Sequence, residues 1–270
     1  MSALDDHALA ADLAERAGHL LLTLRARGGD PDALRNAGDR QSHEFLMAEL
    51  TRERPDDAVL SEEGTDDKTR LKADRVWIVD PLDGTREFGE PGRSDWAVHV
   101  ALWARDAPAG PGIPAAAFAS AGSGDLVAGA VALPAQNRVL STIIPTTNPA
   151  DQGARRQLRM VVSRTRASAL VKDVATRLDA ELVPCGSAGA KAATVVLGEN
   201  DVYLHSGGFY EWDTAAPVAV ARANGFHVSR IDGSPVRYNQ EDPLLPDILV
   251  CRPAIAPVLL NAIREATHAI

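Results

Sequence analysis

The strongest constraint on the fold is the alternation of predicted strands and helices in the second half of the chain. Strand-like runs at 158–163 and 181–185 are separated by a helical pattern at 168–180. The alternation continues with strands at 201–205 and 247–253 and helices at 187–198, 213–223 and 254–269. This order favours a sheet whose strands are connected by helices. We therefore expect an α/β architecture in this half.

The first half begins with helices and continues with strands. Helical patterns cover 3–27, which ends at a pair of glycines, and 40–53. Apolar strand patterns follow at 76–79, at 95–106 and, as two strands, within 125–144. In the run 95–106, large apolar residues alternate with small ones, which predicts a half-buried strand.

Two irregular stretches suggest how the chain is divided. Residues 106–124 are rich in glycine, proline, alanine and serine and predict a mobile loop. Residues 144–157 are polar and have no period, which is typical of a boundary between subdomains. We expect an N-terminal α+β subdomain at 1–150 and a C-terminal α/β subdomain at 151–270.

The composition excludes several classes of protein. The 270 residues carry a net charge of −9, which argues against a binder of polymeric DNA or RNA. The N-terminus lacks the pattern of a signal peptide, and no apolar run approaches the roughly 18 residues of a membrane span. Cys185 and Cys251 stand alone, as expected of buried thiols in a reducing cytoplasm. We expect a cytoplasmic protein.

The segment WIVDPLDGTREF at 77–88 carries the clearest chemical signal. An apolar strand pattern ends at Asp80 and Asp83, with a proline between them and a Gly-Thr pair behind. Such a cluster directly after a buried strand is typical of an active-site loop. Pro81 stiffens the turn, Gly84 allows a phosphate to approach the backbone, and the Thr85 hydroxyl can hold a water. A polar junction without function is the alternative.

Acidic residues recur in four segments that end predicted strands or begin predicted helices: 38–39, 61–64, 80–85 and 211–217. Carboxylates from separate loops can hold two Mg²⁺ ions, which activate a water and stabilise a leaving oxygen. The spacing of the two aspartates differs from that of phosphatases that form a phospho-aspartate. The sequence also lacks a P-loop and a serine-hydrolase elbow.

The motifs SEE at 61–63, WIVDPLDGT at 77–85 and EWDTAA at 211–216 resemble those of the lithium-sensitive, magnesium-dependent inositol monophosphatase superfamily. The resemblance covers nearly the whole chain. It implies an alternating α-β-α-β-α sandwich, a small phosphorylated substrate, two or three Mg²⁺ ions and a homodimer.

The resemblance also implies roles for individual residues. The metal ligands would be Glu62, Asp80, the Leu82 carbonyl, Asp83 and Asp213. Asp39 and Thr85 would polarise the attacking water, with Glu62 as a further catalytic residue, and Asp83, Gly84 and Thr85 would contact the phosphate. Alternatively, Asp39 caps a helix that starts at residue 40, Asp213 is a first-turn acid, and Glu63 is a neighbour of the ligands.

Three further features resemble the CysQ-type branch, the 3'-phosphoadenosine 5'-phosphate (PAP) phosphatases: Arg86-Glu87 behind DPLDGT, VVSRTR at 161–166 and GSAGAK at 186–191. Ser187 and Lys191 at a helix N-terminus would hold the 5'-phosphate, and Arg164 and His205 would contact the adenylate. The open alternatives are a solvated arginine, a surface lysine and a strand-end histidine.

We therefore expect a 3'(2'),5'-bisphosphate nucleotidase that converts PAP to AMP and phosphate and serves sulfate assimilation. The enzymatic alternative is a phosphatase of inositol-1-phosphate or fructose-1,6-bisphosphate with broad specificity. A sensor of phosphorylated ligands is the alternative from another class, although the complete set of acidic residues argues against it.

Overall fold

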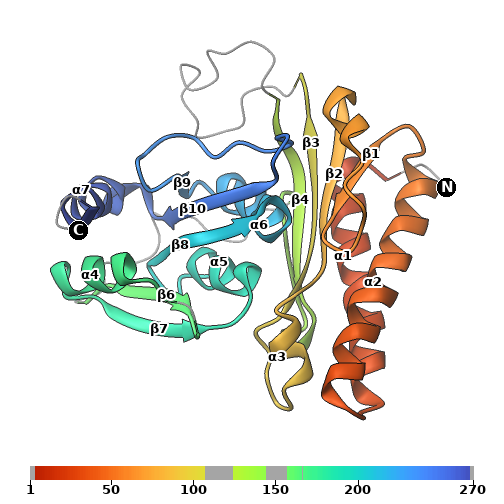
Figure 1. The fold of residues 1–270 in the computed structure, drawn as a ribbon, viewed down its shortest axis with the longest axis horizontal. Helices are drawn as coiled ribbons and strands as arrows, with labels where there is room; N and C mark the ends of the chain where they lie inside the picture. The colour runs from red at the N-terminus through yellow and green to blue at the C-terminus, as the bar shows by residue number, and fades with distance from the viewer. Residues whose placement is uncertain (1–3, 107–123, 144–156, 166, 268–270) are drawn as a thin grey trace.

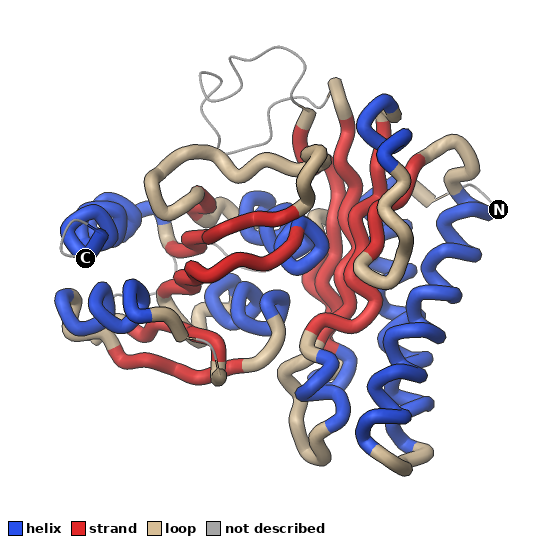
Figure 2. Tube along the Cα trace, viewed as in Figure 1, coloured by secondary structure: helices blue, strands red, loops and turns tan. Residues whose placement is uncertain are grey.

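The computed structural model describes residues 4–106, 124–143, 157–165 and 167–267. These residues form two five-stranded sheets, and helices cover both faces of each sheet (Figure 1). The layers follow one another as helix, sheet, helix, sheet and helix (Figure 2). The α-β-α-β-α sandwich predicted from the sequence is confirmed.

The first sheet has the order β1-β2-β3-β4-β5. Its strands are β1 (Ala58–Ser61), β2 (Arg75–Asp83), β3 (Ala97–Ala104), β4 (Asp125–Leu133) and β5 (Arg138–Ser141). β1 and β2 are parallel, and the other neighbouring strands are antiparallel. Because β1 and β2 are parallel, their carboxyl ends lie at the same edge of the sheet.

Helices α1 (Asp6–Ala26) and α2 (Pro31–Glu53) cover the outer face of this sheet. α2 begins at Pro31 rather than at residue 40, because the Asp30 side chain accepts hydrogen bonds from the N–H groups of Asp32 and Ala33. Asp39 therefore lies inside α2, and its interpretation as a helix cap is wrong.

Strand β3 is buried on both faces, which differs from the half-buried strand predicted for it. Val98, Val100 and Leu102 pack toward α1 and α2, while Ala97 and Ala101 face the helices between the sheets. The small side chains on that face let α6 (Glu211–Ala223) approach closely. A Cβ added to Gly129 of the neighbouring strand would lie 2.8 Å from Ala219 Cβ of α6.

Strand β2 continues beyond the predicted end at residue 79 and reaches Asp83. Its pairing with β3 shifts in register between Asp80 and Asp83, where Pro81 lies. A local irregularity accommodates a residue that cannot donate a ladder hydrogen bond, so the sheet continues around the proline. The short helix α3 (Thr85–Gly89) follows directly.

The second sheet has the order β7-β6-β8-β10-β9. Its strands are β6 (Arg159–Ser163), β7 (Glu181–Cys185), β8 (Val202–Tyr210), β9 (His227–Ser229) and β10 (Leu244–Cys251). Helices α5 (Ala188–Val196) and α6 lie between the two sheets. Helices α4 (Ala169–Arg177) and α7 (Ala256–Thr267) cover the outer face. β9 was not predicted, because three residues carry too little periodicity.

Most of the predicted loop at 106–124 and of the predicted boundary at 144–157 lies outside the described residues. The first sheet uses residues 58–141 and the second uses 159–251, so each sheet is continuous in sequence. The division into subdomains at residue 150 stays a prediction. No helix in the described ranges is long and apolar enough to cross a lipid bilayer.

The packing of α1 on the first sheet leads to a stability prediction. Leu13 of α1 is fully buried in the cluster that joins the helix to the sheet. We expect Leu13→Ala to lower the free energy of unfolding by about 2–5 kcal/mol, because it leaves a cavity. Urea unfolding measures this change. Val258→Ala, at a position that is 56% exposed, is the control and should stay within about 0.5 kcal/mol of wild type.

Candidate active site

The end of β2 places two carboxylates in the space between the sheets. Asp80 and Asp83 are 1% and 7% exposed, so both carboxylates are surrounded by protein atoms rather than by bulk water. The Leu82 N–H donates to Asp80 Oδ1 at 3.0 Å. The Ser42 hydroxyl of α2 donates to the Pro81 carbonyl oxygen at 2.7 Å. These bonds fix the backbone that carries both carboxylates.

Glu62 follows β1 and so lies at the same sheet edge as the end of β2. Its N–H donates to the Val79 carbonyl oxygen at 3.4 Å, which continues the parallel pairing by one residue. His43 of α2 holds this turn through a contact of 2.9 Å between its Nδ1 and Ser61 Oγ. Much of the Glu62 residue is exposed, but Glu62 lines the pocket together with Asp80.

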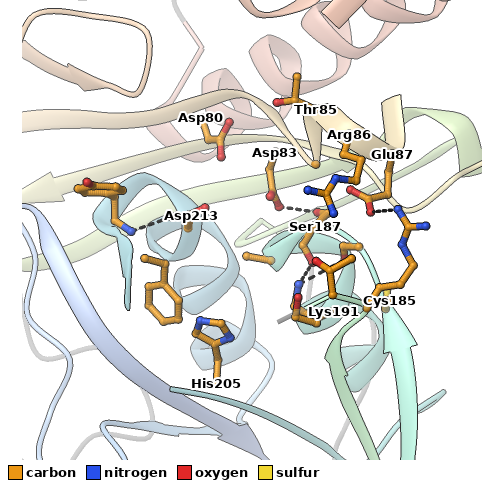
Figure 3. Close-up of a pocket in the computed structure, with 18 of the residues that line it drawn as sticks. Asp80, Asp83, Thr85, Arg86, Glu87, Cys185, Ser187, Lys191, His205 and Asp213 are labelled. Carbon is orange, nitrogen blue, oxygen red and sulfur yellow. Dashed lines mark hydrogen bonds and ion pairs between the residues drawn. The ribbon is translucent and has the colours of Figure 1, made fainter. Parts of the chain in front are cut away.

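Asp213 comes from the facing side, in the first turn of α6. One of its oxygens accepts the Tyr210 N–H at 2.7 Å, which caps the helix. Figure 3 shows Asp80 and Asp83 pointing from β2 toward the side from which Asp213 comes. Both interpretations of Asp213 are therefore compatible, because it caps α6 and also lines the pocket with Glu62.

These residues line a pocket of about 610 Å³. Every predicted metal ligand lines it, and so do all the predicted substrate contacts: Gly84, Thr85, Arg164, Ser187, Lys191 and His205. Asp39 is outside this lining, although Thr85 Oγ1 lies 3.4 Å from Asp39 Oδ1. The structure thus brings the predicted site residues close together, although they are spread between positions 39 and 213 of the sequence.

Thr85 links Asp39 to the end of β2. Its Oγ1 lies 3.1 Å from the Leu82 carbonyl oxygen as well as 3.4 Å from Asp39. Burial, together with repulsion from Glu63, raises the pKa of Asp39 to about 6. The carboxyl is therefore ionised at neutral pH and can accept a hydrogen bond from the hydroxyl or from a water. Glu63 itself is exposed and does not line the pocket.

Asp83 is held by two hydrogen-bond donors and one histidine, which all face one of its oxygens. Oδ2 accepts the Ser187 hydroxyl and the Gly189 N–H, the latter at 2.7 Å, and it lies 3.1 Å from His99 Nε2. The Nδ1 of His99 lies 3.0 Å from the Trp212 carbonyl oxygen, next to Asp213. Because Oδ2 takes these contacts, Oδ1 is the oxygen left for a ligand.

The N-terminus of α5 is thus bound to a carboxylate of the protein itself. Ser187 is the N-cap, as predicted, and its Oγ accepts the Ala190 N–H at 2.9 Å. Lys191 is 6% exposed, and its Nζ donates to the Ser187 carbonyl oxygen at 2.6 Å. The interpretation of Lys191 as a surface residue is wrong. Whether Ser187 and Lys191 bind a phosphate stays a prediction.

Arg164 and His205 both line the pocket. The Nη2 of Arg164 donates to Glu87 Oε1 at 2.7 Å and to Glu90 Oε1 at 2.9 Å. Arg164 is therefore paired with two carboxylates of the protein, although its side chain is 28% exposed. The His205 ring lies 4.7 Å from the Phe209 ring, and both line the pocket. This wall is aromatic, which suits a planar ligand.

Burial and mutual repulsion perturb the carboxyls of the pocket. Desolvation and repulsion from Asp213 raise the pKa of Glu62 to about 7. Desolvation and repulsion from Glu62 raise the pKa of Asp80 well above its ordinary value. Desolvation and the charge of Asp83 raise the pKa of Asp213 to about 6. Burial opposes ionisation of Asp83 too, but the charge of His99 outweighs it and lowers the pKa of Asp83.

The donor set fits a hard divalent cation. Repulsion from Glu62 opposes ionisation of Asp80, and repulsion from Asp213 opposes ionisation of Glu62. A cation among these oxygens would remove the repulsion. Among the described residues, Asp80, Asp83 and His99 also lie within 4.8 Å of one another. His99 is fully buried and does not line the pocket, so the acidic residues on the open side are the better ligands.

Sequence reasoning missed His99, Ser42 and His43, which position the carboxylates. Their contacts depend on how β3 and α2 pack against β2, and no local motif marks them. Glu211, from the acidic segment 211–217, has a structural role. Glu211 is 1% exposed and accepts the N–H groups of Asn239 and Gln240 at 2.7 and 2.8 Å.

The two cysteines are free, and neither belongs to the potential metal cluster found among the described residues. Cys251 is buried in the outer core of the second sheet, as predicted. Cys185 lines the pocket, but burial raises the pKa of its thiol to about 12. The thiol is therefore protonated at neutral pH and does not act as a nucleophile.

Comparison with known proteins gives consistent results. Residues 8–268 match the model of the inositol monophosphatase family. A 3'-phosphoadenosine 5'-phosphate phosphatase of Mycobacterium leprae (strain TN) is 51% identical over 97% of this chain and 94% of that protein. The 3'(2'),5'-bisphosphate nucleotidase CysQ of Escherichia coli (strain K12) is 29% identical over 77% and 81%. The crystal structure of CysQ from Bacteroides thetaiotaomicron superposes with a TM-score of 0.72 at 28% identity, over 91% of this chain and 96% of that one.

The perturbed carboxyls predict how stability depends on pH in metal-free protein. The pKa values of Glu62 and Asp213 are raised to about 7 and about 6, so the folded state binds protons more tightly than the unfolded state. Their contribution is complete below their unfolded pKa values and is lost as the pH rises through 6–7. The raised pKa of His99 acts in the same direction. The lowered pKa of Asp83 has the opposite effect: it stabilises the folded state above the unfolded pKa, and this contribution is lost only at more acidic pH.

We therefore expect the Tm of the chelated protein to fall between pH 5 and pH 8. Thermal denaturation in EDTA across this range measures the slope. Saturating Mg²⁺ should remove most of the change in Tm with pH. In the absence of metal, Asp213→Asn should make this change smaller than in wild type. A Tm that is flat or rises with pH in EDTA would contradict the assignment of these carboxyls.

Proposed function

Because this chain belongs to the inositol monophosphatase family, we propose that it is a metal-dependent phosphomonoesterase that converts PAP to AMP and inorganic phosphate. The observation that carries the proposal is the meeting of Glu62, Asp80, Asp83 and Asp213 in one pocket with an aromatic wall. The 51% identity to a PAP phosphatase supports the choice of substrate.

We assign the metal sites as the family resemblance implies. Glu62, Asp80 and the Leu82 carbonyl would hold one Mg²⁺, and Asp80, Asp83 and Asp213 a second. Bound there, Mg²⁺ polarises the phosphate and lowers the pKa of water. Two or three ions, inhibition by lithium, a homodimer, a cytoplasmic location and a role in sulfate assimilation are further expectations from the resemblance.

The residues of the chain have distinct roles in this proposal. Asp39 and the Thr85 hydroxyl orient the attacking water, since they lie 3.4 Å apart and Asp39 is ionised at neutral pH. The Gly84 and Thr85 backbone contacts the transferred phosphate. The donors on Asp83 Oδ2 keep its other oxygen aimed into the pocket. Positioning of this kind lowers the barrier because the groups need not reorganise during the reaction.

The rest of the pocket favours a nucleoside over a polyol. Tyr203, His205, Phe209 and Tyr210 line it, and the His205 and Phe209 rings are 4.7 Å apart. Aromatic faces stack on a base, whereas the hydroxyls of inositol need polar partners. Arg164 is bound to Glu87 and Glu90, so we place it in the wall rather than against the base. A protein that only senses a phosphorylated ligand does not need all four carboxylates of Glu62, Asp80, Asp83 and Asp213, which argues against a sensor.

A comparison of three substrates tests the specificity. We expect kcat/KM with Mg²⁺ to be at least a hundredfold higher for PAP than for inositol-1-phosphate or fructose-1,6-bisphosphate. This ratio corresponds to roughly 2.7 kcal/mol of transition-state preference. Release of inorganic phosphate measures it. Equal rates, or a sugar phosphate in the lead, would leave a phosphatase but refute the PAP assignment.

Asp83→Asn tests the metal assignment. We expect kcat to fall at least a hundredfold while the protein still folds. The asparagine oxygen can still accept from Ser187 and Gly189, but the charge that attracts the cation is lost. Calorimetric titration with Mg²⁺ should show weaker binding. Asp74→Asn, with a side chain that is 86% exposed, is the matched control. Turnover like that of wild type in Asp83→Asn would refute the assignment.

A further inference from the structure

Two of the proposed metal ligands come from segments that are far apart in the sequence. Glu62 follows β1 of the first sheet, whereas Asp213 lies in the first turn of α6, which packs between the sheets. We build on the proposed function, in which both carboxylates bind Mg²⁺. Two ions about 3.5–4 Å apart need ligands at a fixed separation. Contacts that join the segments carrying Glu62 and Asp213 therefore bear on the metal centre.

A buried arginine holds the loop that begins at Glu62. Arg70 is 1% exposed and lies in the 3₁₀ helix η1 (Lys68–Lys72), between Glu62 and β2. Its Nε and Nη2 donate to the two oxygens of Asp66 at 2.6 and 3.0 Å. A bidentate pair of this kind fixes both distance and orientation. The loop behind Glu62 is therefore folded onto η1.

The same guanidinium reaches the segment that precedes β10. Arg70 Nη1 donates to Asn239 Oδ1 at 2.7 Å, and Nη2 donates to the Gln240 carbonyl oxygen at 2.8 Å. Lys68 adds a contact of 2.5 Å from its Nζ to the Glu241 carbonyl oxygen. The loop behind Glu62 is thus joined to residues 239–241 of the second half of the chain.

Glu211 joins this segment to α6. It is 1% exposed, and its two oxygens accept the N–H groups of Asn239 at 2.7 Å and Gln240 at 2.8 Å. Its own N–H donates to the Pro243 carbonyl oxygen at 2.9 Å. Glu211 is the first residue of α6 and shares its first turn with Asp213. These bonds therefore fix the start of the helix that carries Asp213.

The contacts form one continuous network, the Arg70 network, made by the side chains of Asp66, Arg70, Asn239 and Glu211. None of these four side chains lines the pocket. We propose that the Arg70 network positions Glu62 and Asp213 relative to each other and thereby sets the affinity of the metal centre for Mg²⁺. Its members are positioning residues, because they lie outside the pocket and act through the two carboxylates.

Stability alone is a weak reason for such a network. Taking Arg70 and Glu211 out of water carries a large desolvation cost, and well-packed apolar residues of similar volume often stabilise a fold as well or better. A hydrogen-bonded polar network supplies a single geometry instead, since a shift of one member leaves a buried charge unpaired. A fixed separation of two metal ligands is what the proposed chemistry requires.

Glu211→Gln tests the proposal. Glutamine keeps the volume and one acceptor oxygen, but its NH₂ group opposes one of the two N–H groups that Glu211 accepts. We expect the Kd of Mg²⁺ to rise about tenfold, as is typical when a partner behind a metal ligand is changed. Calorimetric titration of the metal-free protein measures it. The Mg²⁺ concentration for half-maximal activity should rise by a similar factor, while KM for PAP at saturating Mg²⁺ stays near that of wild type.

Two further variants separate positioning from stability. Arg70→Lys keeps the charge but loses the two-pronged geometry, so we expect the Kd of Mg²⁺ to rise here too. Asp201→Asn is the matched control: Asp201 is 4% exposed, accepts the Arg159 N–H at 2.9 Å and pairs with Arg252 at 3.1 Å, away from the pocket. It should lower stability in urea unfolding and keep the Kd of wild type.

Three results would overturn the inference and leave the proposed function standing. The first is a Kd for Mg²⁺ in folded Glu211→Gln and Arg70→Lys that matches wild type. The second is an equal rise in Asp201→Asn, and the third is loss of the fold in both network variants, which would assign the network to stability alone. A wild-type protein that neither binds Mg²⁺ nor hydrolyses PAP would instead refute the proposed function.

Discussion

The contacts that fix the Asp83 carboxylate are the constraint on which the rest of the site depends. Asp83 belongs to the first sheet, while two of its donors, the Ser187 hydroxyl and the Gly189 N–H, belong to the layer between the sheets. One residue therefore fixes α5 against β2. His99 extends the contact to the Trp212 carbonyl beside Asp213. The acidic residues of both layers are thus set relative to each other by a buried network.

This network constrains the sequence at positions that never touch a ligand. A Cβ on Gly189 would lie 2.0 Å from His99 Nε2, so only glycine allows this approach. Ser187 has a φ of 50°, a conformation that costs a residue other than glycine on the order of 1–3 kcal/mol. The backbone tolerates this strain because the hydroxyl of Ser187 then reaches Asp83 and the Ala190 N–H together.

The sequence predicts the layered fold and the acidic loops because their signals are local. WIVDPLDGT carries a strand, a stiff turn and two carboxylates within nine residues, and α5 has its serine cap. The sequence does not predict contacts between residues that meet only when two layers of the fold pack together. The burial of both faces of β3 and the contact of His99 with Asp83 are tertiary. The start of α2 does have a local signal, the Asp30 cap before Pro31, which the prediction of a start at residue 40 missed. An anion at the start of α5 follows from local physics, but its identity as Asp83 does not.

The charges of the pocket form two groups with different surroundings. Asp80, Asp83 and Lys191 are buried and bonded to the protein, so their positions are set before any ligand arrives. Arg86 and Glu62 are more exposed and can respond to what enters. Rigid groups suit the bond that breaks, because transition-state stabilisation requires fixed geometry.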